Sequence, residues 1–78
     1  MPRYFFHVID GLEIRDDQGV DLPHMNAVRA YAMQASGDML KGGGHPDLWN
    51  GEDWKMIVTD EAGREVAILR FSAQQVAA

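Results

Sequence analysis

The stretch RYFFHVIDGLEIR, residues 3 to 15, has the pattern of two strands joined by a tight turn. Aromatic and β-branched side chains fill residues 3 to 9, and these residue types favour an extended strand. Asp10-Gly11 follows, a dipeptide typical of two-residue hairpin turns because both central positions need a positive φ. Residues 12 to 15 then alternate between apolar and charged side chains, as a returning strand with one wet face does. The chain therefore begins with a predicted β-hairpin.

After Pro23 the apolar residues change their spacing from two to about 3.6, which is the period of an α-helix. Five of them would share one helical stripe: Met25, Val28, Ala32, Ala35 and Met39. Pro23 suits a first helical turn, and Lys41 followed by Gly42 is a typical helix end, with Gly42 expected in a left-handed cap. A helix from Pro23 to Lys41 is predicted. Gly37, with Ala32 and Ala35, is expected to form a small-residue surface that lets this helix lie close to a sheet.

The second half of the chain predicts another hairpin. Residues 54 to 59 alternate as a strand, residues 60 to 63 form a turn with a glycine near its end, and residues 64 to 72 return. The fold class is therefore α+β, in the order β-β-α-β-β, with a four-stranded and mostly antiparallel sheet and one helix packed on one face. Strands 3–9 and 64–72 are apolar on both faces and are expected inside the sheet, with strand 12–15 at an edge.

The length predicts one domain, residues 1 to 78, with a folded core over 1–72 and a frayed tail over 73–78. A single core of this size seldom supplies more than roughly 3 to 5 kcal/mol, and self-association buries more apolar surface. One helix covers only one face of the sheet, so apolar residues of the other face predict an interface, either with a second copy in a homodimer or with another, unidentified protein partner. If Tyr4, Phe6 and Val8 face the helix, that interface holds Phe5, Ile57 and Leu69. Trp49, in a loop, is either a lid over the sheet or an exposed binding contact.

Charge and composition argue against nucleic acid and membrane as partners and favour a cytoplasmic location. The formal charge is −5, from 12 acidic and 7 basic residues, and the basic residues are scattered. Nucleic acid and anionic membrane are bound mainly through basic clusters, so neither is expected as a partner. The absence of cysteine removes disulfides and thiolate metal sites. No signal peptide or run of 18 apolar residues is recognised, and a cytoplasmic protein is expected.

Several short motifs carry no predicted chemistry. His45-Pro46-Asp47 spells the tripeptide of J-domain co-chaperones, but one helix precedes it and a strand follows, so a plain loop is predicted. The glycines at 42–44 end a helix, whereas phosphate-binding loops open one. The three histidines, His7, His24 and His45, share no metal-ligand spacing, so neither a metal nor another cofactor is expected. No nucleophile and base are placed together, so no enzyme activity is predicted.

Aromatic residues on the strands have two interpretations. Tyr4, Phe5, Phe6 and Phe71 resemble the stacking platforms of single-strand RNA binders, but the acidic balance favours a core role. The leading hypothesis is a small, non-catalytic protein–protein interaction module that self-associates through a sheet face or edge. The alternative is a nucleic-acid-linked regulatory or antitoxin-like partner protein, which rests on fold analogy.

The motif PRYFFHV-x-DG, at residues 2 to 11, resembles the start of a family of short, uncharacterised bacterial proteins from soil and plant-associated alphaproteobacteria. The resemblance continues through Asp17-Gln18-Gly19, the alanine-rich helix, Val58-Thr59-Asp60-Glu61-x-Gly63 and Leu69-Arg70-Phe71-Ser72. The family is a domain of unknown function. The resemblance therefore implies a source and a fold, and transfers no catalytic residue.

Overall fold

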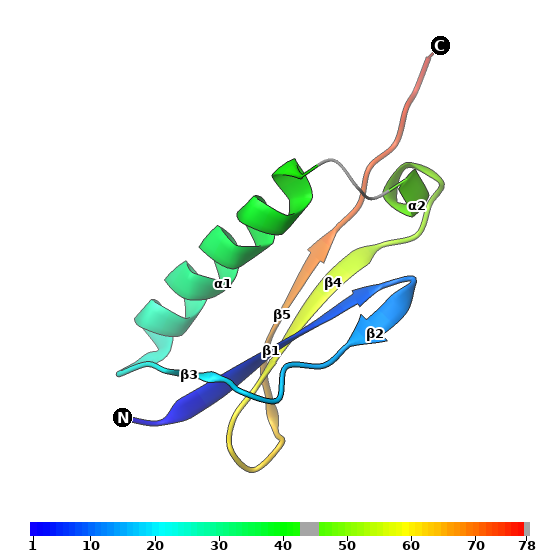
Figure 1. The fold of residues 1–78 in the computed structure, drawn as a ribbon. Helices are drawn as coiled ribbons and strands as arrows, with labels where there is room; N and C mark the ends of the chain where they lie inside the picture. Colours follow the sequence, from blue (N-terminus) through cyan, green and yellow to red (C-terminus); the bar gives the residue numbers. More distant parts are fainter. Residues whose placement is uncertain (43–45, 78) are drawn as a thin grey trace.

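A computed structural model describes residues 1–42 and 46–77 of the chain. Its strands are β1 (Arg3–Asp10), β2 (Leu12–Ile14), β3 (Val20–Asp21), β4 (Trp54–Thr59) and β5 (Glu65–Phe71), and its helices are α1 (Met25–Lys41) and the short α2 (Pro46–Trp49). Helix α1 lies against one side of an antiparallel sheet, which confirms the predicted α+β fold (Figure 1). The sheet gains one strand over the prediction, because the two residues of β3 pair with the start of β1.

The strands are ordered β2-β1-β4-β5 in the sheet. The prediction that the last strand lies inside the sheet is wrong, because β4 pairs with both β1 and β5 and leaves β5 at an edge. Strand β5 has apolar residues on both faces for another reason. Ile68 projects from the face that α1 leaves open, where it pairs with Ile57 and remains 45% exposed.

The core lies between α1 and the two central strands. Its buried apolar residues are Phe6 and Val8 of β1, Val28 and Ala32 of α1, and Trp54, Met56 and Val58 of β4. Phe6 and Val8 thus face the helix, which is the orientation assumed when Phe5 and Ile57 were assigned to the opposite face. Trp54 closes one end of this core, where its ring meets Phe71 edge-on with 5.6 Å between centroids. Such aromatic pairs add stability beyond the area that they bury.

The helix begins two residues later than predicted. His24 is the N-cap in an extended conformation, and its Nδ1 accepts a hydrogen bond from the Ala27 N–H at 3.1 Å. This bond satisfies one of the free N–H groups of the first turn. Pro23 therefore precedes the helix. At the other end Gly42 has a φ of −66°, so the predicted left-handed cap is wrong, and its N–H donates to the Met39 carbonyl as a continued helical turn.

The buried stripe of α1 is rotated from the predicted one. Its fully buried residues are Val28, Ala32 and Ser36, whereas Met25 and Met39 are exposed. Ser36 is tolerated in the core because its hydroxyl donates to the Met56 sulfur at 3.4 Å. Gly37 has open space where a side chain would point, so it plays no part in a close approach to the sheet.

Both hairpins turn at glycines with positive φ, Gly11 at 72° and Gly63 at 81°. Asp10 is the last residue of β1 and has no positive φ, so the prediction of a positive φ at both Asp10 and Gly11 is wrong. At Gly63 the turn is also held by Asp60, whose carboxylate accepts from the Ala62 and Arg64 N–H groups. In the described part of the chain, neither helix has the length and hydropathy that crossing a membrane requires. Most of the glycine run and the first residue of His45-Pro46-Asp47 lie outside the described residues.

Candidate interaction surface

The face of the sheet opposite α1 carries an apolar pair on neighbouring strands, Ile57 of β4 and Ile68 of β5. His7 of β1 lies on the other side of Ile57 and is buried. Phe5 lies on the same face, where its ring stacks on His7 with 6.5 Å between centroids. The structure therefore places Phe5 and Ile57 on the predicted face and brings them together around His7.

Leu69 is not on this face, and the prediction of its orientation is wrong. It pairs with the buried Met56 and packs against the core under α1. The run of apolar residues at 66–69 hides the alternation of β5, and an irregularity between Val58 and Thr59 shifts the register further. Ile68 takes the exposed position that the sequence analysis assigned to its neighbour.

The outer edge of β5 borders an apolar groove that the sequence analysis missed. This groove, of about 190 Å³, lies between α1 and β5 and is lined by Arg29, Ala32, Met33, Ala67, Ile68 and Leu69. Met33 is 58% exposed beside it. In the sequence, the sign of this groove is that Met33 directly follows Ala32 of the predicted apolar stripe. An apolar residue next to the stripe lies on the flank of the helix. Exposed apolar side chains therefore accompany β5 on the helix side of its edge as well as on the open face.

Two cations lie side by side on the open face. Lys55 of β4 is the register partner of Arg70 of β5, and like charges directly opposite one another destabilise a sheet. Within the described residues, neither forms an ion pair, and neither does Glu65 at the other end of β5. The β5 edge thus has an acidic residue at one end and a basic residue at the other, and neither forms an ion pair within the described part of its own chain.

Of the two positions expected for Trp49, a lid over the sheet or an exposed contact, the structure shows the exposed one. It is 61% exposed at the end of α2, while its neighbour Leu48 packs against the core. Leu48 is therefore the lid, and the indole of Trp49 borders an open hollow with Asp53 and the first residues after β5. The four predicted interface residues consequently lie in three environments: the open face, the core under α1 and the α2 end.

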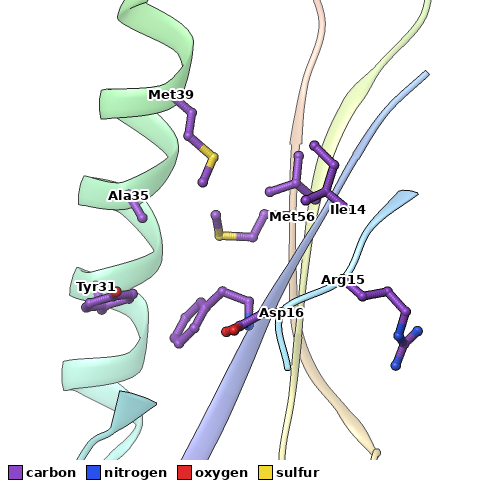
Figure 2. Close-up of a pocket in the computed structure, with 9 residues that line it drawn as sticks. Ile14, Arg15, Asp16, Tyr31, Ala35, Met39 and Met56 are labelled. Carbon is purple, nitrogen blue, oxygen red and sulfur yellow. The ribbon is translucent and has the colours of Figure 1, made fainter. Parts of the chain in front are cut away.

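A second apolar groove lies on the other flank of α1. It has a volume of about 300 Å³, and Tyr31, Met39 and Met56 line it opposite Ile14 of β2 (Figure 2). Leu12 and Ile14 of β2 are largely exposed because α1 does not extend over this strand. The side chain of Arg15 points away from the groove, and Asp16 adds a carboxylate to the otherwise mostly apolar lining (Figure 2).

His7 and Asp16 form a closed polar network beneath the loop that follows β2. His7 is 6% exposed, and its Nδ1 accepts from the Asp16 N–H at 3.0 Å. Nε2 therefore carries the ring proton and donates to the Thr59 hydroxyl at 3.0 Å. Both ring nitrogens are engaged inside the fold, so the geometry is that of a structural histidine.

The carboxylate of Asp16 holds the same loop against β1. It accepts hydrogen bonds from the N–H groups of Phe6, Gln18 and Gly19 at 3.0 to 3.1 Å. Burial alone would raise the pKa of Asp16, but these three backbone hydrogen bonds outweigh it and lower the pKa below 3.8.

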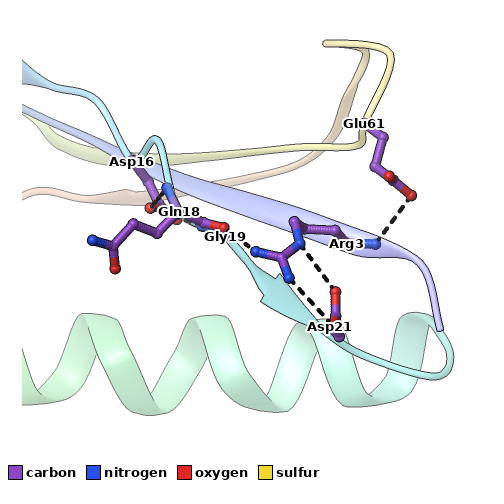
Figure 3. Close-up of polar contacts among 6 residues, drawn as sticks. All are labelled: Arg3, Asp16, Gln18, Gly19, Asp21 and Glu61. Atoms are coloured by element: carbon purple, nitrogen blue, oxygen red, sulfur yellow. Dashed lines mark hydrogen bonds and ion pairs between the residues drawn. The ribbon is translucent and has the colours of Figure 1, made fainter.

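Arg3 fastens the other end of this loop. Its guanidinium donates to the Gln18 carbonyl and pairs with the Asp21 carboxylate at 3.2 Å (Figure 3). Its backbone N–H donates to Glu61 at 3.3 Å. These contacts of Arg3 stabilise the loop, and the polar groups bond to one another within the chain.

Metal binding has no geometric support in the described residues, where no group of three His, Asp or Glu side chains gathers. His7 and His24 lie on different elements and each accepts a backbone N–H. His45 lies outside the described residues.

Comparison with known proteins identifies a family without an assigned activity. No curated protein and no solved structure shows significant similarity to the chain. The model of the DUF6894 domain of unknown function matches residues 3–72, which include every strand and both helices. The chain therefore belongs to the DUF6894 family, a domain of unknown function.

Proposed function

We propose that this protein is a small, non-catalytic protein–protein interaction module that associates with a second copy of itself through the β5 side of its sheet. The observation that carries the proposal is the exposure of Ile68 and Met33 on the two sides of one sheet edge. Exposed apolar side chains gathered along an unpaired strand favour association, because the contact removes both apolar surface and open backbone groups from water.

The size of the domain supports the same proposal. Among the residues whose burial the structure describes, seven apolar residues are buried, and Ser36 and His7 occupy two further buried positions. A core of this size gives a modest free energy of unfolding, so burial of Ile68 and Met33 in a dimer would add a substantial fraction of it.

Sedimentation equilibrium over a range of micromolar concentrations tests the proposal. We expect a concentration-dependent dimer for the unaltered chain and a monomer for Ile68→Lys. Leu12→Lys is the matched control, because Leu12 is also an exposed apolar residue but lies on β2 at the opposite side of the sheet. A monomeric mass for the unaltered chain at high micromolar concentration would overturn self-association, and dimer loss in Leu12→Lys alone would move the contact to β2.

The alternative, a nucleic-acid-linked regulatory or antitoxin-like protein, has one favourable observation. Lys55 and Arg70 lie together on the open face beside Ile57, and the half-buried ring of Phe5 lies farther along the same face, opposite Thr59. Single-strand binders combine cations with aromatic rings. The net charge of −5 opposes this function. Binding of labelled single-stranded oligonucleotides at low salt, abolished by Arg70→Glu, would favour the alternative.

A further inference from the structure

We infer that two copies join their β5 strands antiparallel to each other, with the two Ile68 residues opposite one another at a twofold axis. The two sheets then become one continuous sheet with an α1 helix of each copy on the same side. The inference rests on the proposed self-association and specifies its contact, register and partner.

Strand β5 is the edge of this sheet best suited to pairing. It spans seven residues and is regular from Ala67 to Phe71, with its irregularity confined to the first residues. The other end of the sheet is β2, which has three residues. Natural edges are commonly protected by short length, by proline or by a bulge in the strand. Over most of its length β5 has none of these, so its outer N–H and C=O groups form a template for a second strand.

Symmetry and length select the register. In an antiparallel pair related by a twofold axis, one residue must face its own copy, and its neighbours pair at equal distances on either side. Ile68 is the middle residue of Glu65–Phe71, so the register centred on it gives the longest overlap of the two strands. It also joins the Ile57–Ile68 rows of the two copies into one apolar row across the open face.

The charges on β5 favour the same arrangement. In this register Arg70 of one copy lies beside the start of the other copy's β5. Glu65 projects from the same open face there, because the register shift makes Val66 an extra residue and pairs Glu65 with Thr59. Two such contacts form by symmetry, and each gives Arg70 an acidic neighbour in addition to the Lys55 that it faces within its own chain. Cross-strand pairs of opposite charge stabilise a sheet and like-charge pairs destabilise it. A parallel arrangement would instead place Arg70 beside Arg70 and Glu65 beside Glu65.

The groove between α1 and β5 is covered by the same contact. Its outer wall is open beside Ala67 and Leu69, which pair with Leu69 and Ala67 of the second copy in this register. Met33 stands above that edge on α1 and is exposed in the single chain. The second copy therefore removes from water the apolar groups on the helix side of β5 as well as Ile68 on the open face.

Cysteine cross-linking tests the register directly, because the chain has no cysteine of its own. Residues directly opposite in antiparallel strands have Cα atoms about 4.5 to 5.5 Å apart, which lies within the range that a disulfide spans. We expect Ile68→Cys to form a covalent dimer under mild oxidation. Ile57→Cys is the matched control on the same face, since three strand spacings, about 14 Å, separate its two copies in the continuous sheet.

The outcomes of this experiment separate the register from the proposed function. Cross-linking of Ile57→Cys but not of Ile68→Cys would show stacking of open faces and overturn strand pairing while leaving self-association intact. A dimer that neither variant cross-links would also overturn the register. A monomer by sedimentation would overturn both.

A charge exchange provides the second test. Arg70→Glu places two acidic residues together at both ends of the contact and is expected to weaken the dimer roughly tenfold. The double variant Glu65→Arg/Arg70→Glu has the net charge of the unaltered chain and is expected to restore dimerisation to within about threefold. Equal affinity of Arg70→Glu and the unaltered chain, or no recovery in the double variant, would refute the antiparallel register.

Discussion

Replacement of Gly19 by alanine should unfold much of the protein, because this glycine meets two separate constraints. Its φ of +74° lies in the left-handed region, which costs an L-residue about 1 to 2 kcal/mol. A Cβ atom there would also lie 2.8 Å from Arg3 Cγ, 2.9 Å from Phe5 Cε1 and 2.9 Å from the Tyr4 carbonyl oxygen. The Arg3 and Phe5 atoms belong to side chains, but the Tyr4 oxygen is a backbone atom of β1, whose pairing with β3 and β4 prevents an easy shift.

Overpacking of this kind adds about 1 to 3 kcal/mol, so the total loss in the free energy of unfolding is about 2 to 5 kcal/mol. A single core of this size has roughly 3 to 5 kcal/mol in all. Gly63→Ala is the matched control, since Gly63 has a similar φ of +81° but no atom within 4 Å of the added Cβ. It should lose only the conformational part, about 1 to 2 kcal/mol.

Urea unfolding followed by far-ultraviolet circular dichroism measures both variants, with the same protein concentration throughout because a dimer would make stability concentration-dependent. The two variants should differ by at least about 1 kcal/mol, which is the contribution of the contacts with β1. If Gly19→Ala and Gly63→Ala lose the same free energy, the close approach of the loop to β1 is refuted.

The remaining predictions concern the loop carboxylate and the α2 lid. Because the pKa of Asp16 is lowered below 3.8 in the folded state, its carboxylate contributes stability that is complete above that value and lost as the pH falls through the folded pKa. Asp16→Asn should therefore be less stable than the unaltered chain at pH 7, and urea titrations should show the difference shrinking toward pH 3; a constant difference would contradict the assignment. Leu48→Ala should lose about 1 to 2 kcal/mol because Leu48 packs on the core. Trp49→Ala should stay within about 0.5 kcal/mol because its side chain is exposed, and a larger loss would contradict that exposure.

The hairpins and the helix could be predicted from local sequence because their signals are local. Gly11 and Gly63 supply the positive φ that their turns need, and the change of apolar period after Pro23 marks the helix. The helix boundary could not be placed as well, since it depends on the contact between the His24 ring and the Ala27 N–H. The strand β3 left no signal, because two residues are too few for a period.

The candidate surface was less predictable, because it depends on which strand becomes an edge. Phe5 and Ile57 were placed correctly from the alternation of β1 and β4. Leu69 was misplaced because residues 66–69 are all apolar, so the alternation of β5 cannot be read without the register against β4. The exposure of Ile68 and Met33, and the pairing of Lys55 with Arg70, follow from packing between elements that are distant in sequence.

Local sequence was enough to place the two hairpins and α1 along the chain and to identify the glycines at which the hairpins turn. Local backbone preferences and hydrophobic periods suffice for these features, since each is set within a few residues. Tertiary structure alone decided that β5 is an edge, that Leu48 and not Trp49 covers the core, and that Asp16 bonds to β1. These features join residues far apart in the chain, and their positions depend on the whole packing arrangement.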